Sequence, residues 1–271
     1  MTKRAPPGPA STVRIFFWRG RVLYVGPVDD LEVHAHHAVQ AVVSPAGPFE
    51  IDIGDEPART RAVLIDSDLP HRLDSLGQDA AVFLIEPESL DAARLRRGCL
   101  QSCGHHLIGP ELADPVIGSL SVLGDQGAGC AEAAECFDRL LEAWGCGPEP
   151  LPDRDERIDA ALAHIRSLHR KQISLSELAA LVHLSESRFI HLFTEHVGIP
   201  PRRYLLWVRL MHAIEAAIGG DNLTTAAHEA GFADSAHLSR TFRRMFGRTP
   251  ALFSAATKDS QFVQSLLCTD R

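Results

Sequence analysis

The sequence predicts a two-domain chain, with an N-terminal all-β sandwich followed by helices and a C-terminal all-α domain that holds two helix-turn-helix units. Three observations support this fold class. Short runs with strand character, separated by Gly, Pro and Asp, fill residues 13–86. Apolar residues recur at helical spacing after residue 154. Residues 154–258 carry 14 Lys and Arg against 10 Asp and Glu, a net of +4 in a chain of net charge −8.

A Gly- and Pro-rich stretch marks the division between the two parts. Residues 145–152 contain two glycines and three prolines, which do not continue a helix. We therefore expect a first domain over residues 13–145, a linker over 146–154 and a second domain over 155–256. Because the first part is acidic and the second basic, only the second is suited to bind a polyanion.

The first domain is expected to contain seven strands, in the runs VRIFFW, RVLYVG, LEVHAH, AVQAVV, FEIDI, RAVLID and AVFLIE. Their short, even spacing favours an antiparallel sandwich or barrel. Ser89 is expected to cap a helix that follows Pro87, and residues 130–144 form a longer amphipathic helix. The apolar face of that helix packs either on its own sheet or on a second subunit, and both alternatives stay open.

The second domain shows helix signals in order along the chain. Ser174 and Glu177 form a capping box, and Ser185 caps the next helix. A long apolar helix ends at the glycines 219–220. A short helix then precedes Gly231, and a last helix has the apolar stripe of Leu238, Phe242 and Phe246. The second helices of the two units are expected at about 186–197 and 235–246.

The two units resemble each other, since SRFIHLFTEHVGIP corresponds to AHLSRTFRRMFGRTP. The second unit, EAGFADSAHLSRTFRRMFGRTP, resembles the C-terminal signature of the AraC/XylS family of bacterial transcription regulators. LSELA, LSESRFIHLF, GIPPRRYL and VRLMHA extend the resemblance to about a hundred residues. More weakly, DLPHRL and FLIEP are similar to the cupin-like (jelly-roll) sensor and dimerisation domain that precedes it in many members.

The resemblance implies a cytoplasmic, effector-responsive and sequence-specific regulator that places two recognition helices in adjacent major grooves of double-stranded DNA. Residues near the start of each helix would reach bases: Glu186, Ser187, Arg188, Ile190 and His191 in the first unit, and Ser235, Ala236, His237, Ser239 and Arg240 in the second. Arg240 is the best candidate to read guanine. Arg202, Arg203, Arg243, Arg244 and Thr249 suit phosphates instead. The alternative for these arginines is a solvated helix face.

The histidines of the first domain have several interpretations. His34, His36 and His71 are similar in placement to the metal ligands of cupin enzymes, although Gln40 stands near where a carboxylate ligand is expected. We expect them to line a small-molecule effector pocket without a metal or other cofactor. A metal site, and purely structural histidines, stay open. The corresponding alternative function is a cupin-type metal-binding protein or enzyme with an accessory DNA-binding domain, and a third is a regulator that responds to its own abundance.

Other features limit the remaining function classes. Neither a phosphate loop, nor a dinucleotide motif, nor a nucleophile–base pair is visible in the sequence, so we do not expect an enzyme. No apolar run is long enough for a transmembrane helix or a signal peptide. The six cysteines are expected to be reduced, and Cys99, Cys103, His105 and His106 could hold a soft metal or sense oxidants. Family resemblance also implies homodimerisation through residues 111–144 and contact with RNA polymerase.

Overall fold

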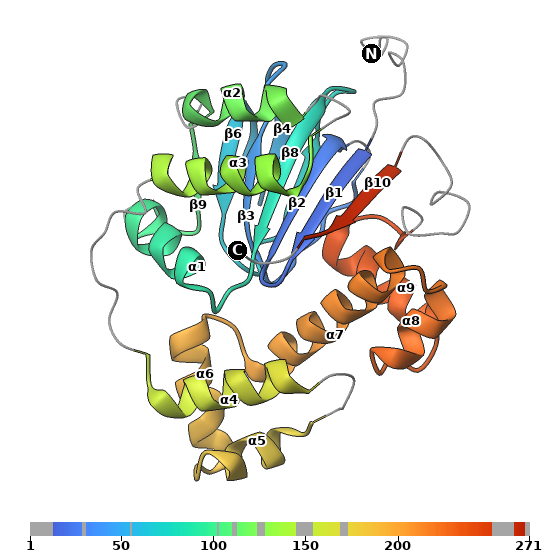
Figure 1. Cartoon of the computed structure of the whole chain (residues 1–271). Helices are drawn as coiled ribbons and strands as arrows, with labels where there is room; N and C mark the ends of the chain where they lie inside the picture. The colour runs from blue at the N-terminus through green and yellow to red at the C-terminus, as the bar shows by residue number, and fades with distance from the viewer. Residues whose placement is uncertain are drawn as a thin grey trace.

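The computed structural model describes residues 13–28, 31–54, 56–101, 103–109, 113–123, 128–144, 154–168, 173–250 and 263–268. A β-rich N-terminal part carries three helices on one face of its larger sheet, and a helical C-terminal part lies beside it (Figure 1). This agrees with the predicted fold class. The predicted linker, 146–154, lies outside the described residues except for Arg154.

Two sheets form the sandwich. The larger has the strand order β10-β1-β2-β8-β3-β6-β9, and the smaller has the order β5-β4-β7. The strands are β1 (Val13–Trp18), β2 (Arg21–Pro27), β3 (Val39–Val43), β4 (Phe49–Ile53), β5 (Glu56–Thr60), β6 (Ala62–Ile65), β7 (His71–Asp74), β8 (Asp79–Ile85), β9 (His106–Ile108) and β10 (Val263–Leu267). Among the described strand pairs, β1 with β10 is parallel and all others are antiparallel, as their short connections require.

The strand predicted at LEVHAH is wrong. Residues 31–36 contribute an isolated bridge between His34 and His71 and no longer ladder. Burial along this run does not alternate, and two of its residues contact the C-terminal part, Glu32 through Arg243 and His36 through Phe246. Tertiary contacts therefore replace the ladder that a strand would have made.

Strand β1 is buried on both faces because it lies between two sets of helices. Phe16 and Trp18 pack toward the helices on the outer face of the large sheet, and Ile15 and Phe17 pack toward the C-terminal helices. The outer helices are α1 (Leu90–Leu95), α2 (Asp114–Leu123) and α3 (Cys130–Ala143), with a π-helical turn η1 (Arg96–Leu100) after α1. As predicted, Ser89 Oγ accepts from the amide N–H of Ala92 at the start of α1.

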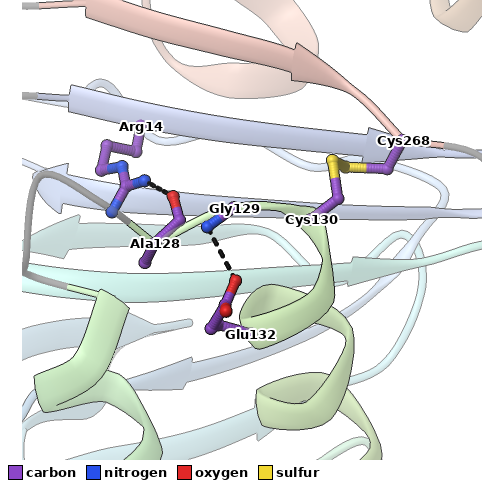
Figure 2. Close-up of a disulfide and its surroundings, with 6 residues drawn as sticks. All are labelled: Arg14, Ala128, Gly129, Cys130, Glu132 and Cys268. Atoms are coloured by element: carbon purple, nitrogen blue, oxygen red, sulfur yellow. Dashed lines mark hydrogen bonds between the residues drawn. A yellow bond between two sulfur atoms is a disulfide. The ribbon is translucent and has the colours of Figure 1, made fainter.

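The apolar face of α3 packs on its own sheet. Its Phe137 ring contacts Phe83 and Trp18, with centroid separations of 5.2 and 6.2 Å. Of the two alternatives left open by the sequence, the intramolecular one accounts for this stripe. The buried guanidinium of Arg14 donates to the carbonyls of Leu123 and Ala128, and so ties β1 to the segment between α2 and α3 (Figure 2).

The prediction that all six cysteines are reduced is wrong. Cys130, at the start of α3, forms a disulfide with Cys268, directly after β10 (Figure 2). No local sequence pattern predicts this pair, because the two cysteines are 138 positions apart in the sequence. The chain thus returns after the helical part, adds β10 to the edge of the first sheet beside β1, and is fastened there.

The secondary structure of the C-terminal part, in its described residues between 155 and 246, consists of helices joined by short turns. Its helices are α4 (Glu156–Ser167), α5 (Leu175–Leu181), α6 (Glu186–Val197), α7 (Pro201–Ile218), α8 (Leu223–Glu229) and α9 (Ser235–Phe246). Figure 1 shows α7 running between the α5–α6 pair and the α8–α9 pair. Within the described ranges, no helix combines the length and apolar character needed to cross a bilayer.

Candidate nucleic-acid interface

Local chemistry sets the first helix-turn-helix unit. Ser174 Oγ accepts from the amide of Glu177, whose carboxylate accepts from the amide of Ser174, so α5 begins with the predicted capping box. His183 has a φ of 56° in the turn. Ser185 then caps α6 by accepting from the amide of Arg188. The left-handed residue allows only four residues to separate the end of α5 from the start of α6.

The second unit repeats this arrangement. Asn222 caps α8, Gly231 has a φ of 79° in the turn, and Asp234 accepts from the amide of His237 to begin α9. His183 and Gly231 each lie two residues beyond the end of a first helix. Sequence reasoning identified the glycine but missed the histidine. Aligning the two units is the signal that could have found it, since a left-handed residue is then required at the same place in both.

The residues predicted to contact bases lie at the start of α6 and α9, as the helix bounds require. Those with exposed side chains are Glu186, Ser187, Arg188, His191, Ala236 and Arg240, and those partly buried are Ile190, Ser235, His237 and Ser239. Two of the second group have packing roles. Ile190 contacts the core around α6, and the His237 ring lies 5.2 Å from Phe232. Phe189, Phe193 and Phe242 are buried, as core residues should be.

Two of the arginines predicted to contact phosphate are held by carboxylates of the N-terminal part. Arg243 donates to both carboxylate oxygens of Glu32, with Nε to Oε2 at 2.9 Å. Arg203 donates to Asp68 at 2.9 Å, and Asp68 also bonds His37 at 2.5 Å. Arg202, Arg244 and Thr249 are exposed. On both Arg203 and Arg243, a carboxylate accepts the hydrogen bonds that a phosphate oxygen would accept in a DNA complex.

Apolar and polar contacts join the two parts along α7. Trp207, Met211 and Ile214 of α7 share a buried cluster with Ile15 and Phe17 of β1. The Tyr204 hydroxyl donates to the Glu88 carboxylate at 2.5 Å. Burial raises the pKa of Tyr204 well above its usual value, and burial with the charge of Glu88 raises the pKa of Glu86. We call this junction the domain seam.

The structure brings the three predicted effector-pocket histidines together at the domain seam. One ligand atom from each of His34, His36 and His71 lies within 4.8 Å of the others, and all three side chains are buried. Burial lowers the pKa of His34, lowers that of His36 to about 4 and lowers that of His71 well below its usual value. At neutral pH they are therefore uncharged imidazoles.

Of these three histidines, His34 lines one of two cavities in the described part of the chain. A cavity of about 120 Å³ is walled mostly by apolar side chains of the sheet, α7 and α9, and includes His34, Gln40 and Arg248. A larger one, of about 670 Å³, lies between the β1–β2 hairpin and α7 and includes Arg19, Glu86, Arg166 and His212. The larger cavity is a better fit for a small molecule than the predicted histidine pocket.

The residues Cys99, Cys103, His105 and His106, which could have held a metal, do not form a comparable group of ligands. Among the described residues, only His34, His36 and His71 bring three potential ligands together. The buried Cys99 thiol donates to the carbonyl of Trp144, and burial raises its pKa, whereas the His105 side chain is 79% exposed. A thiol with a raised pKa is a poor oxidant sensor.

Comparisons with known proteins agree with the helix-turn-helix geometry. A family model described as a helix-turn-helix domain matches residues 178–256. The C-terminal domain is of the AraC type. The probable transcriptional regulator LumQ of Photobacterium leiognathi is 32% identical over 101 residues, 36% of this chain and 41% of LumQ. The transcriptional activator RhaS of Klebsiella pneumoniae (strain 342) is 34% identical over 103 residues, 38% of this chain and 37% of RhaS. The match thus spans about two fifths or less of these curated relatives.

Solved structures extend the likeness beyond this AraC-type domain to the whole fold. ToxT from Vibrio cholerae O395 superposes with a TM-score of 0.57 at 12% identity, covering 87% of this chain and 97% of ToxT. ToxT from strain SCE256 with bound unsaturated fatty acid gives 0.55 at 15% identity, covering 87% and 96%. A β-rich N-terminal part followed by a helical C-terminal part is therefore an arrangement that this chain shares with ToxT.

Proposed function

We propose that the protein is a sequence-specific transcription regulator that inserts α6 and α9 into successive major grooves of double-stranded DNA. The observation that carries the proposal is the repeated unit, in which two capped recognition helices follow turns of the same geometry and are joined by α7. Successive grooves on one face of DNA are about 34 Å apart, which two units on one rigid helix can span.

The proposed contacts divide into two chemical classes. Arg240 is exposed near the start of α9, and its guanidinium suits the O6 and N7 atoms of guanine. Arg188 and His191 would read bases from α6, with Glu186, Ser187 and Ala236 beside them. Arg202, Arg244 and Thr249 suit phosphates, which position the protein without specifying sequence.

In this conformation, carboxylates of the N-terminal part bind two of the arginines that are proposed to contact phosphates. Arg203 and Arg243 can meet DNA only after leaving Asp68 and Glu32. We propose that an effector controls this exchange, and that the cavity of about 670 Å³ beside α7 is where a small molecule would bind. Support comes from its position on the domain seam and from the fatty acid bound by the similarly folded ToxT.

The proposed partners follow from this role. As a regulator rather than an enzyme, the protein would act in the cytoplasm, where it could contact RNA polymerase. A homodimer through residues 111–144 would have to use the outward face of α2, where Val122 is 49% exposed, because the apolar face of α3 is occupied. The outward face of α3 carries Glu135, Asp138 and Glu142, two of which are paired with Arg139 and Arg21, so it offers charged rather than apolar contacts.

Selection of binding sites from random duplexes by the full chain, at fixed salt, tests the proposal. We expect a bipartite consensus with halves about one helical turn apart. Arg240→Ala should lose discrimination at one base pair, whereas Arg244→Ala should weaken all duplexes alike and reduce the salt slope by about one. Weak, sequence-blind binding, or identical behaviour of the two variants, would refute the assignment of recognition helices.

A further inference from the structure

We propose that His34, His36 and His71 form a binding site for one divalent transition-metal ion at the domain seam. The site is built on paired backbone. His34 and His71 exchange two backbone hydrogen bonds of 3.0 and 2.9 Å, which hold their rings 4.3 Å apart. The His36 ring lies 5.3 Å from His71 and 6.0 Å from His34.

Hydrogen bonds decide which ring nitrogen carries the proton. The Nδ1 atoms of His34, His36 and His71 bond the backbone carbonyls of Glu32, Ala38 and Leu69, at 2.9, 3.2 and 2.9 Å respectively. A carbonyl oxygen only accepts, so Nδ1 of His34 and Nδ1 of His71 carry the hydrogen and donate it, which leaves each Nε2 with an available lone pair. On His36 the Gln40 oxygen also faces Nε2, so this nitrogen binds a metal only with the proton on Nδ1, toward the Ala38 carbonyl. This orientation of histidine by a backbone carbonyl is the usual outer support of a metal ligand.

One of these ring nitrogens has no partner in the protein. His71 Nε2 is buried without a hydrogen-bond partner. The side chains of His34, His36 and His71 are only 5%, 2% and 1% exposed, so solvent does not easily supply donors. A buried polar atom without a partner destabilises the folded state, and a bound cation would remove that cost. Three imidazoles without a carboxylate suit Zn²⁺, Co²⁺, Ni²⁺ or Cu²⁺, and do not suit Mg²⁺ or Ca²⁺.

Gln40 provides the fourth position. Its side-chain oxygen lies 2.5 Å from His36 Nε2, so the amide faces the same centre as the imidazoles. Tetrahedral zinc sites have Zn–N distances of about 2.0–2.1 Å, which puts ligand atoms about 3.3 Å apart. From separations of up to 4.8 Å, the three nitrogens would have to move together when the ion binds.

That movement would also shift residues that contact α7 and α9 of the DNA-binding part. The His36 ring lies 6.3 Å from Trp207 of α7 and 6.0 Å from Phe246 of α9. The position where a Cβ would stand on Gly247, at the end of α9, is 2.8 Å from His34 Nδ1. A metal ion is thus a candidate signal for the regulator. This last step rests on the proposed function, whereas the site itself does not.

Metal binding to the tag-free full chain tests the site without DNA. After chelator treatment, titration with Co²⁺ should give one equivalent of binding and a visible band typical of tetrahedral coordination, which Zn²⁺ displaces. His71→Ala and His34→Gln should each weaken binding by about 100-fold or more, while His105→Ala, outside the site, should bind as the wild type does. Gln40→Glu should tighten binding at least about 10-fold, because it supplies a carboxylate ligand.

The Gln40→Glu gain keeps the test decisive if a histidine variant fails to fold, which circular dichroism would show. Absence of Co²⁺, Zn²⁺ and Ni²⁺ binding at micromolar concentrations would overturn the site. Retention of the bound ion in folded His71→Ala and His34→Gln, or its loss in His105→Ala, would do the same. Because the metal titration contains no DNA, its outcome does not test the recognition helices. Failure of the binding-site selection likewise does not test the metal site.

Discussion

Gly198 and Gly247 offer a matched test of how firmly the DNA-binding part is held by the N-terminal part. They end α6 and α9 in the same left-handed conformation, with φ values of 87° and 68°. Their surroundings differ. A Cβ on Gly247 would lie 2.6 Å from the backbone oxygen of Glu32, whereas a Cβ on Gly198 would meet a side-chain group, the guanidinium of Arg96, at 3.3 Å.

The two glycines should therefore respond differently to alanine. In both, the left-handed backbone costs alanine about 1–2 kcal/mol. Only Gly247→Ala also forces a backbone contact apart, at the point where the Glu32 amide donates to the Gly247 carbonyl at 3.1 Å. Overpacking of this kind costs about 1–3 kcal/mol more. We expect the free energy of unfolding to fall by about 1–2 kcal/mol in Gly198→Ala and by about 2–5 kcal/mol in Gly247→Ala.

Urea denaturation of the full chain measures the total effect, and exchange of the Glu32 amide, which donates to the Gly247 carbonyl, measures whether the domain seam has opened. Exchange at this amide should rise in Gly247→Ala and stay at the wild-type level in Gly198→Ala. Equal losses of stability, or unchanged exchange at the seam in Gly247→Ala, would refute the argument that the Gly247 contact fastens the two parts.

Three further predictions follow from the disulfide and the ion pairs. Cys268→Ser should lower the free energy of unfolding by up to about 5 kcal/mol, since the disulfide closes a loop with a sequence separation of 138. The control Cys103→Ser, which breaks no disulfide, should lower it by less than about 0.5 kcal/mol. Equal urea midpoints of the two variants would contradict this. Glu32→Gln should free Arg243, raise DNA affinity and steepen the salt slope by up to about one in gel-shift titrations, unlike the exposed control Glu50→Gln. Burial and Glu88 raise the pKa of Glu86, so the folded state holds that proton more tightly and stability falls as pH rises from about 4.3 toward the folded pKa. Glu86→Gln should remove this loss and be more stable than wild type at pH 8, whereas parallel stability–pH curves would refute the assignment.

The sequence alone determined the helices and turns of the AraC-type domain. Ser174, Ser185 and Gly231 act on backbone groups within a few residues of themselves, so their effects can be read locally. The strands with alternating or continuous apolar residues were found for the same reason. His183 is an exception, because an L-residue in the left-handed region is held there by the helices on both sides and gives little signal of its own.

Tertiary structure decided what joins residues that are distant along the chain. The addition of β10 beside β1, and the disulfide behind it, bring residue 268 to residue 130, and no local pattern records that closure. Glu32 and Arg243 are 211 residues apart in the sequence, and the fold brings them together in an ion pair between the two parts. This pair engages an arginine that was predicted to contact phosphate. The three histidines were visible as residue types, but their convergence depends on a bridge between His34 and His71 that only the folded sandwich makes. Local chemistry fixes the elements, whereas the surfaces they present to each other depend on how the whole chain packs.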